Sequence, residues 1–370
     1  MGKHLPRQVR SALRAWLTPL RKPQQPQALI YLVGLLWIIR FRSLREIASR
    51  YGGSLDRLQH FVSCSTPCAR ALQHQGQQHL ARQAPGQAAA LLVLDDTPVA
   101  RNGQAIEGLG WHHTPKGLVR GWCAVTAMLK VGAQRFLWAV RGYRPKKNCP
   151  PGQFQSKVEL AIQIVREAAA CFPRSGLTVL MDSWYACAGL LTAIHAAGWT
   201  YLAAVRANRL VVLPGSPRKQ SVRSLAKSRH GWRTVRAGKK RRYRVRRLRA
   251  WLPQVGDVQV FVVRNGGEVR GFVSNDLGLS EAAMVRLYGQ RWWIETLHRE
   301  LKQHVGFGEL FVRKWAAAER HWTLCGLAYN LVVLWNGKRR RSFGAMVRAF
   351  RKAVSSDELI QFHKLLVKTS

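Results

Sequence analysis

The sequence predicts an α/β protein in which a mixed β-sheet follows an all-α N-terminal region and is interrupted by a β-rich insertion. Three patterns predict this order. Residues 1–88 repeat apolar side chains at helical spacing, residues 89–207 alternate short apolar runs with helical segments, and residues 208–279 alternate like strands. A chain of 370 residues, 47% of them hydrophobic, is long enough for two or three domains.

The N-terminal region predicts two short helices on either side of Gly52-Gly53. Leu44 and Ile47 precede this pair at helical spacing, Leu55 and Leu58 follow it, and Ser54 is placed to cap the second helix. Such a pair suits a helix-turn-helix that reads DNA, and it equally suits a small helical bundle. The Gln-rich stretch 73–87 predicts a linker.

Export and membrane segments are not visible in the sequence. The longest early apolar run, residues 28–39, has 12 residues and is too short to span a bilayer. Seven scattered cysteines favour reduced thiols and a cytoplasmic protein. His60, Cys64 and Cys68 follow helical spacing, but without a second ligand pair nearby we favour ordinary helix packing over a zinc site.

The segment from residue 89 predicts the sheet. An apolar run at 89–97 ends in Asp95-Asp96, two segments that read as an antiparallel pair follow, and after a helix a second run at 177–182 ends in Asp182. A further helix and strand complete the order of an RNase H-like sheet. In that fold the first and fourth strands are neighbours, so by analogy the acids at their tips converge. Taken singly, each acid could instead cap a turn.

The insertion and the C-terminal part follow from local signals. Residues 208–279 are rich in Arg, carry a hairpin signal at 265–267, and are expected to lie along DNA. Ser280 is placed to cap the next helix, and helical stretches at 313–336 and 343–368 flank a basic run at 338–341.

Four side chains define the most informative helix. Tyr288, Arg291, Glu295 and Lys302 lie within a stripe about 60° wide if the helix is continuous, at about 100° per residue. A carboxylate flanked by a phenol and two cations suits a nucleic-acid backbone beside a metal ion.

The spacing Y-x2-R-x3-E-x6-K resembles the signature of bacterial insertion-sequence transposases of the DDE class. The segments DDT at 95–97 and DSWYA at 182–186 resemble the acidic motifs of that family, and the resemblance covers residues 43–335. It implies an RNase H-like catalytic core with a β-insertion, two Mg2+ ions with Mn2+ as a substitute, and cut-and-paste transposition. The implied metal ligands are Asp95, Asp182 and Glu295, with Asp96 as the alternative to Asp95, and the implied phosphate contacts are Tyr288, Arg291 and Lys302.

The resemblance sets the expected organisation and partners. We expect a helical DNA-binding region at 1–88, the catalytic core at 89–207 and 280–337, the insertion at 208–279 and a basic helical region at 338–370. The expected partners are double-stranded DNA with inverted repeats at the element ends, target DNA and a second copy of the chain, with no membrane. Trp292 could stack on an unpaired base, although core packing of Trp292 and Trp293 is the favoured interpretation.

The charge agrees with a nucleic-acid partner. The chain carries 60 Lys and Arg against 18 Asp and Glu, a formal charge of +42, and neutralised phosphates release counterions. A small packing protein is disfavoured by the 14 tryptophans and the predicted core. Two rivals stay open: an RNase H-like nuclease without strand transfer, and a non-catalytic DNA-binding protein derived from a transposase.

Overall fold

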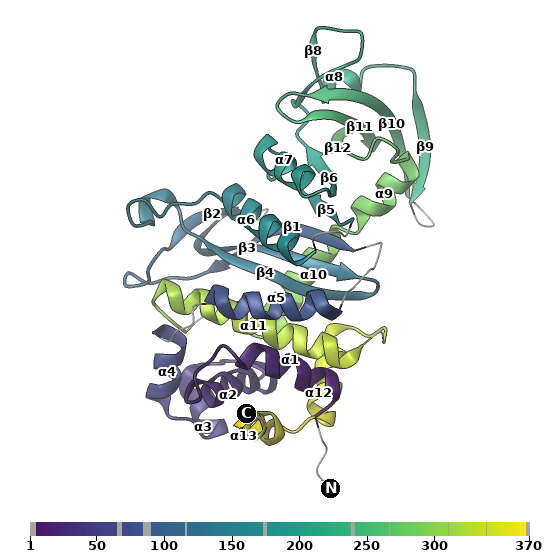
Figure 1. Ribbon diagram of the computed structural model, residues 1–370. Helices are drawn as coiled ribbons and strands as arrows, with labels where there is room; N and C mark the ends of the chain where they lie inside the picture. Colours follow the sequence, from purple (N-terminus) through teal and green to yellow (C-terminus); the bar gives the residue numbers. More distant parts are fainter. Residues whose placement is uncertain are drawn as a thin grey trace. The chain divides into compact units, whose positions relative to one another are not determined.

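The computed structural model describes residues 5–64, 69–83, 90–114, 117–172, 176–237, 241–265, 267–309, 311–337 and 339–367. The chain forms two compact units (Figure 1). Unit 1 contains residues 1–85, 96–156 and 296–370, and unit 2 contains residues 86–95 and 157–295.

Unit 1 begins with a set of helices. Ser43 and Ser54 cap α3 (Leu44–Tyr51) and α4 (Leu55–Ser63) by accepting hydrogen bonds from the Glu46 and Arg57 amides, and Gly52 turns the chain with φ of 70°. The predicted helix pair and its Ser54 cap are therefore confirmed. The helices are α1 (Arg7–Leu17), α2 (Gln24–Trp37), α3 (Leu44–Tyr51), α4 (Leu55–Ser63) and α5 (Ala69–Gln83).

The apolar run at 28–39 falls mostly in α2, whose residues 27–36 are all buried. This explains the run as a core helix of unit 1. Within the described ranges, no helix has the length and hydropathy needed to cross a bilayer.

The predicted linker at 73–87 is wrong over residues 73–83, which belong to α5; residues 84–87 lie outside the described part of the chain. Gln73 and Gln77 are buried, and hydrogen bonds between their side-chain amides and the backbone of a strand offset the cost of burying them. Gln77 Nε2 donates to the Trp138 carbonyl at 3.2 Å, and Gln73 Oε1 accepts from the Val140 amide at 2.8 Å. Polar side chains are needed at these two positions because they bond backbone groups of the strand that would otherwise lack a partner.

The strands of unit 1 are antiparallel. The predicted pair is confirmed as β3 (Gly117–Val131) and β4 (Gln134–Tyr143), and β2 (Gly110–Thr114), which was not predicted, pairs with β3. Ala127 pairs with Ala139 and Met128 with Leu137, so Trp138 is the extra residue of a β-bulge.

The C-terminal helices of unit 1 cover β4. Helix α11 (Trp315–Asn336) is buried along nearly its whole length and packs on β4, α5 and α2. Its Asn330 accepts from the Leu137 amide and donates to the Leu137 carbonyl, each at 2.9 Å. The predicted helix at 313–336 is confirmed, whereas the one at 343–368 is divided into α12 (Phe343–Ala353) and α13 (Ser356–Val367).

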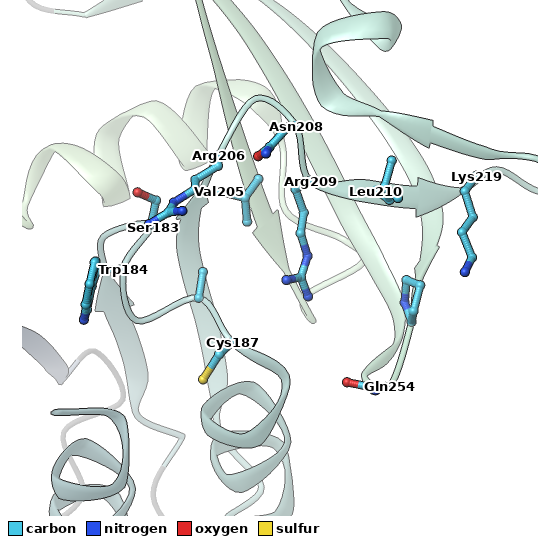
Figure 2. Close-up of a pocket in the computed structure, with 12 residues that line it drawn as sticks. Ser183, Trp184, Cys187, Val205, Arg206, Asn208, Arg209, Leu210, Lys219 and Gln254 are labelled. Atoms are coloured by element: carbon cyan, nitrogen blue, oxygen red, sulfur yellow. The ribbon is translucent and has the colours of Figure 1, made fainter. Parts of the chain in front are cut away.

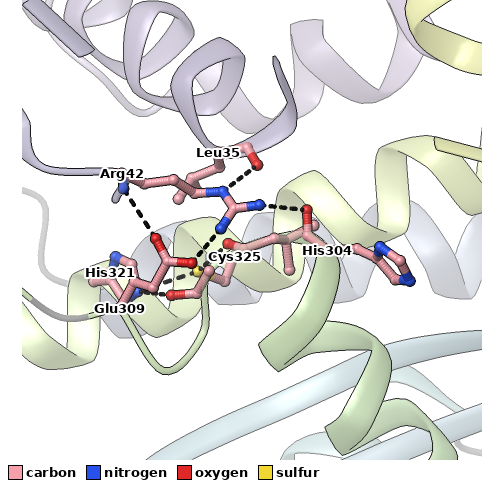
Figure 3. Close-up of polar contacts among 8 residues, drawn as sticks. Leu35, Arg42, His304, Glu309, His321 and Cys325 are labelled. Carbon is pink, nitrogen blue, oxygen red and sulfur yellow. Dashed lines mark hydrogen bonds and ion pairs between the residues drawn. The ribbon is translucent and has the colours of Figure 1, made fainter. Parts of the chain in front are cut away.

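A buried network holds the loop after α10 (Trp292–His304) in unit 1 (Figure 3). The Arg42 guanidinium donates to the Leu35 carbonyl at 3.1 Å, the His304 carbonyl at 3.2 Å and Glu309 Oε1 at 2.5 Å. Burial lowers the pKa of Arg42, and Glu309 partly opposes that shift. One ion pair therefore joins the segment before α3 to the loop after α10.

His321 is a second member of this network. Its Nε2 lies 2.9 Å from the Gly306 carbonyl and its Nδ1 lies 2.7 Å from the Tyr31 hydroxyl. Because a carbonyl can only accept, Nε2 carries the proton and Nδ1 accepts from Tyr31. Burial lowers the pKa of His321 to about 4, which keeps the imidazole neutral.

Unit 2 contains a parallel core of strands. The first half of β1 (Leu91–Ala100) pairs in parallel with β5 (Thr178–Met181), and β5 pairs in parallel with β6 (Thr200–Val205). Helices α6 (Lys157–Cys171) and α7 (Ala188–Ala196) connect them, as predicted. The prediction that the first strand ends at Asp95-Asp96 is wrong, because β1 continues to Ala100 and places both acids inside the strand.

The predicted β-rich segment of unit 2 extends this sheet with antiparallel strands. The order is β6-β12-β11-β10-β7-β8, with β9 also on β10, and Asn265 pairs with Glu268 at the predicted hairpin. Ser280 caps α9 (Glu281–Gly289) by accepting from the Ala283 amide. The elements are β7 (Leu210–Val212), β8 (Lys219–Ser221), α8 (Val222–Leu225), β9 (Trp232–Ala237), β10 (Arg241–Leu252), β11 (Gly256–Asn265) and β12 (Glu268–Ser274).

Candidate active site

Asp95 lies in β1, and Asp182 directly follows the neighbouring strand β5 in unit 2. Leu91, Leu92 and Val93 of β1 pair with Thr178, Val179 and Leu180. Continuing this register by two residues sets Asp95 opposite Asp182. Neighbouring strands are about 4.8 Å apart, so the strand register brings these two acids together.

Asp182 also shapes the turn after β5. Its Oδ1 accepts hydrogen bonds from the Trp184 amide at 2.9 Å and the Tyr185 amide at 3.4 Å. The turn-capping role considered for this acid therefore occurs. It occupies one carboxylate oxygen, and no hydrogen bond reaches Oδ2 among the described residues.

Arg291 joins Asp95 to Glu295. Its Nη1 donates to Asp95 Oδ2 at 3.0 Å and its Nη2 donates to Glu295 Oε1 at 2.5 Å. The side chains of Arg291 and Asp95 are each 17% exposed, and that of Glu295 is 33% exposed. Burial lowers the pKa of Arg291, but the negative charges around it, Asp95 first and Glu295 and Asp182 after it, outweigh burial and raise that pKa.

Tyr288 packs beside this group as a neutral phenol. Its ring lies 4.6 Å from the Phe272 ring, centroid to centroid. Burial raises the pKa of Tyr288 to about 12; Arg291 opposes the rise, and Asp182 and Asp95 add to it. The hydroxyl is therefore a hydrogen-bond donor at neutral pH.

The continuous helix assumed for Tyr288, Arg291, Glu295 and Lys302 is wrong, because α9 ends at Gly289 and α10 begins at Trp292. The intervening turn has tighter bonds, from the Arg291 amide to the Tyr288 carbonyl and from the Ile294 amide to the Arg291 carbonyl. Bonds spanning three residues wind the chain at about 120° per residue, so the stripe calculated for one α-helix does not hold.

Lys302 and Asp96 have other partners, all within unit 1. Lys302 Nζ donates to Thr97 Oγ1 at 2.7 Å and to the Pro98 carbonyl at 2.9 Å, and burial lowers its pKa. Asp96 Oδ2 accepts from the Cys123 thiol at 3.2 Å. Sequence reasoning missed Thr97 and Cys123, whose roles depend on pairings remote in sequence.

Trp292 and Trp293 do not pack in the core, contrary to the favoured interpretation. Their exposed fractions are 61% and 41%. They begin α10 just after the turn that holds Arg291, so two indoles face solvent next to the acidic group. A surface of this kind is available for contact with a ligand.

The acidic group has the donor chemistry for a divalent ion, but its present geometry is that of an ion pair. No three His, Cys, Asp or Glu side chains in the described part of the chain are arranged as a metal centre. Three carboxylates supply the hard oxygen atoms that Mg2+ prefers. Arg291 supplies the positive charge between Asp95 and Glu295, so a divalent ion would compete with this guanidinium for the same oxygens.

The cysteines give no alternative metal centre within the described residues. The six that the structure describes are all free, and Cys68, the last member of the zinc candidate, lies outside the described ranges. The basic runs at 239–242 and 338–341 are described only in part, because residues 239, 240 and 338 lie outside those ranges.

Comparison with known proteins shows a similar fold and a family. A cryo-EM structure of a piggyBac transposase synaptic complex with hairpin DNA is similar, with a TM-score of 0.52 and 15% identity over 93% of this chain and 72% of that chain. At this identity the similarity shows the fold alone. The curated proteins contain no match. The family described as DDE superfamily endonuclease matches residues 12–252, which include Asp95 and Asp182 and make up more than half of the chain. The chain therefore belongs to the DDE superfamily endonucleases.

Proposed function

We propose that the protein is a DNA transposase that excises an insertion sequence and joins its ends to target DNA by a Mg2+-dependent cut-and-paste mechanism. The observation that carries the proposal is that Arg291 forms ion pairs with Asp95 and Glu295, while the charge of Asp182 also acts on Arg291. Family membership supports cleavage of a phosphodiester, and similarity to the piggyBac fold supports the transposase class. The finer assignment to bacterial insertion sequences rests on the Y-x2-R-x3-E-x6-K spacing.

In this proposal Asp95, Asp182 and Glu295 hold two Mg2+ ions, with Mn2+ as a substitute. When bound, such ions make a water or a 3′ hydroxyl nucleophilic and stabilise the leaving oxygen. Arg291 then leaves its carboxylate partners and is free to bind a phosphate as a bidentate donor. Tyr288, kept neutral by burial, donates a hydrogen bond to the same backbone.

The remaining surfaces receive DNA in this proposal. The α3–α4 pair is the candidate sequence reader, and the arginines of β10 contact phosphates without reading bases. We place the helical DNA-binding region at 1–88, the RNase H-like core at 89–207 and 280–337, the β-insertion at 208–279 and a basic region at 338–370. Two copies of the chain hold the two element ends, in the cytoplasm on the bacterial nucleoid.

The experiment that tests the catalytic assignment compares wild type with Asp182→Asn and Glu295→Gln. Nicking of a labelled duplex with Mg2+ or Mn2+ should fall to the detection limit in both variants. Binding of the same duplex, measured by fluorescence anisotropy without metal, should stay within a few-fold of wild type. Nicking at the wild-type rate in either variant would contradict the proposal.

Strand transfer separates the transposase from a simple nuclease. A precut duplex with a 3′ hydroxyl, taken from the inverted repeat flanking the gene, should become joined to a plasmid in the presence of Mn2+. Cleavage without any joined product would assign the chain to the nuclease alternative. Loss of both activities in the wild type, with binding retained, would favour the non-catalytic alternative.

A further inference from the structure

A cavity of about 540 Å3 lies next to Asp182 in unit 2 (Figure 2). It is formed by the turn after β5, the segment between β6 and β7, the start of β8 and the β10–β11 turn. Ser183 and Trp184 directly follow Asp182, and the Trp184 amide bonds its carboxylate. The lining residues used below are Trp184, Cys187, Arg206, Arg209, Lys219 and Gln254.

The wall of the cavity is cationic. Arg206, Arg209 and Lys219 line it, and none of its lining residues is an acid. Figure 2 shows Arg209 extending into the space between Cys187 and Gln254. In the part of the chain that the structure describes, no carboxylate forms an ion pair with these three cations. The cavity therefore suits a ligand that carries negative charge.

An exposed indole borders the same space. The Trp184 side chain is 57% exposed, although a tryptophan gains most from burial. The Arg206 guanidinium carbon and Lys157 Nζ each lie 5.9 Å from its ring centroid. Both cations lie over the ring, so a base that stacks on the indole takes the place of one of them, and the displaced cation is close enough to bind the anionic phosphate of the same nucleotide.

We propose that this cavity binds a nucleotide of single-stranded DNA, with its base on Trp184 and its phosphate on Arg206, Arg209 and Lys219. The inference rests on the proposed function, since it specifies the form in which DNA meets the acidic group. The volume is in the range of about 300–1,000 Å3 that small-ligand sites occupy. A base paired in a duplex presents no face for stacking, so the site selects unpaired strands.

Anisotropy with a fluorescein-labelled oligo-dT and no metal tests this inference. In salt high enough to weaken nonspecific phosphate binding, Trp184→Ala should bind about tenfold more weakly, the usual effect of losing one stacked base. Trp184→Phe keeps an aromatic face and should restore most of the affinity. Equal affinity of Trp184→Ala and wild type would overturn the inference.

The salt dependence separates stacking from charge. Arg209→Ala and Lys219→Ala should each make the slope of log affinity against log salt shallower by about 0.7, because each removes one phosphate contact to a single strand. Trp184→Ala should lower the affinity at every salt concentration without changing that slope. A slope unchanged in both cation variants would remove the phosphate part of the inference.

Matched controls stand elsewhere on the surface. Arg218→Ala removes an exposed cation next to Lys219 that does not line the cavity, and Trp111→Ala removes an indole that is 60% exposed on β2. Both controls should bind oligo-dT within about twofold of wild type. If a control variant weakened binding as much as Trp184→Ala, any exposed indole or cation would contribute equally to DNA binding, and the proposed site would be ruled out.

Competitors identify the source of the nucleotide. Unlabelled oligo-dT should displace the probe at lower concentration than dTMP or oligo-rU. Tighter binding of free dTMP would assign the cavity to a small nucleotide, and tighter binding of the RNA would assign it to another polymer; either result overturns the proposal. The Asp182→Asn and Glu295→Gln nicking assay reports the proposed function separately, so the two failures are distinguishable.

Discussion

The Arg291 guanidinium donates to Asp95 at 3.0 Å and thereby occupies an oxygen that the catalytic assignment gives to a metal ion. The same guanidinium also binds Glu295, so one cation compensates two of the three acids. Like charges gathered without compensation would repel one another and destabilise the fold. Arg291 therefore explains how Asp95 and Glu295 stay close together without a divalent ion.

Removing this guanidinium should strengthen metal binding. Arg291→Ala frees oxygens of Asp95 and Glu295. We expect Mn2+ to bind about tenfold more tightly, which corresponds to a gain of about 1.4 kcal/mol in binding free energy. Electron paramagnetic resonance of free Mn2+, titrated without DNA, measures this. Arg286→Ala, an exposed cation of α9, is the control and should leave the Mn2+ affinity unchanged. Weaker Mn2+ binding by Arg291→Ala would show that the guanidinium does not compete with the metal.

The two adjacent acids of β1 should behave differently. Asp95 shares Arg291 with Glu295, whereas Asp96 accepts from the Cys123 thiol. We expect Asp95→Asn to abolish Mg2+-dependent nicking and Asp96→Asn to retain it within about tenfold of wild type, the lower end of effects at supporting positions. The nicking assay with the labelled duplex measures both variants. The reverse pattern would assign the ligand to Asp96.

Stability should fall in acid because of His321. Its pKa in the folded protein is about 4, below its ordinary value of 6.5, so the unfolded chain binds a proton first as the pH falls. The contribution of neutral His321 to the free energy of unfolding is fully present above pH 6.5. It is lost progressively between pH 6.5 and 4, and the total loss is about 3 kcal/mol.

Urea unfolding at several pH values measures this effect. His321→Gln keeps a donor for the Gly306 carbonyl and does not titrate, so its stability should depend less steeply on pH in that window. His113→Gln replaces an exposed histidine of β2 and should keep the wild-type slope. The same slope in His321→Gln and wild type would contradict the assignment.

Asn330→Ala should loosen β4. The substitution leaves the Leu137 amide and carbonyl without their side-chain partner, and each unsatisfied buried group costs about 1–3 kcal/mol. Hydrogen exchange followed by mass spectrometry should show faster exchange in peptides that contain β4. Asn208→Ala, at an exposed asparagine, should leave the exchange of β4 unchanged.

The sequence predicted correctly those features whose signal is local. Ser54 and Ser280 cap the helices they were assigned to, and the strands on either side of the predicted hairpin pair with each other, Asn265 with Glu268. Each signal depends on a few neighbouring residues, because caps and tight turns are formed by groups close in the chain. The register of Asp95 and Asp182 needed the fold analogy, since sequence spacing does not specify strand pairing.

The features that were missed depend on remote partners. The sequence predicts Gln73 to be part of a polar linker, because its hydrogen-bond partner Val140 lies 67 residues further along the chain and local sequence does not reveal it. The exposure of Trp292 follows from the turn at 290–291, and no breaker residue marks that turn apart from Gly289. The cavity beside Trp184 combines four segments, and none of them has a recognisable motif.

The amide side chains along β4 have a consequence for how the molecule meets other copies of itself. An outer strand with free amides and carbonyls can template a strand from the next molecule and start a fibre. Here Gln73, Gln77 and Asn330 already occupy such groups of β4. A second copy of the chain therefore finds these groups of β4 already bonded, which disfavours growth of a fibre through this strand.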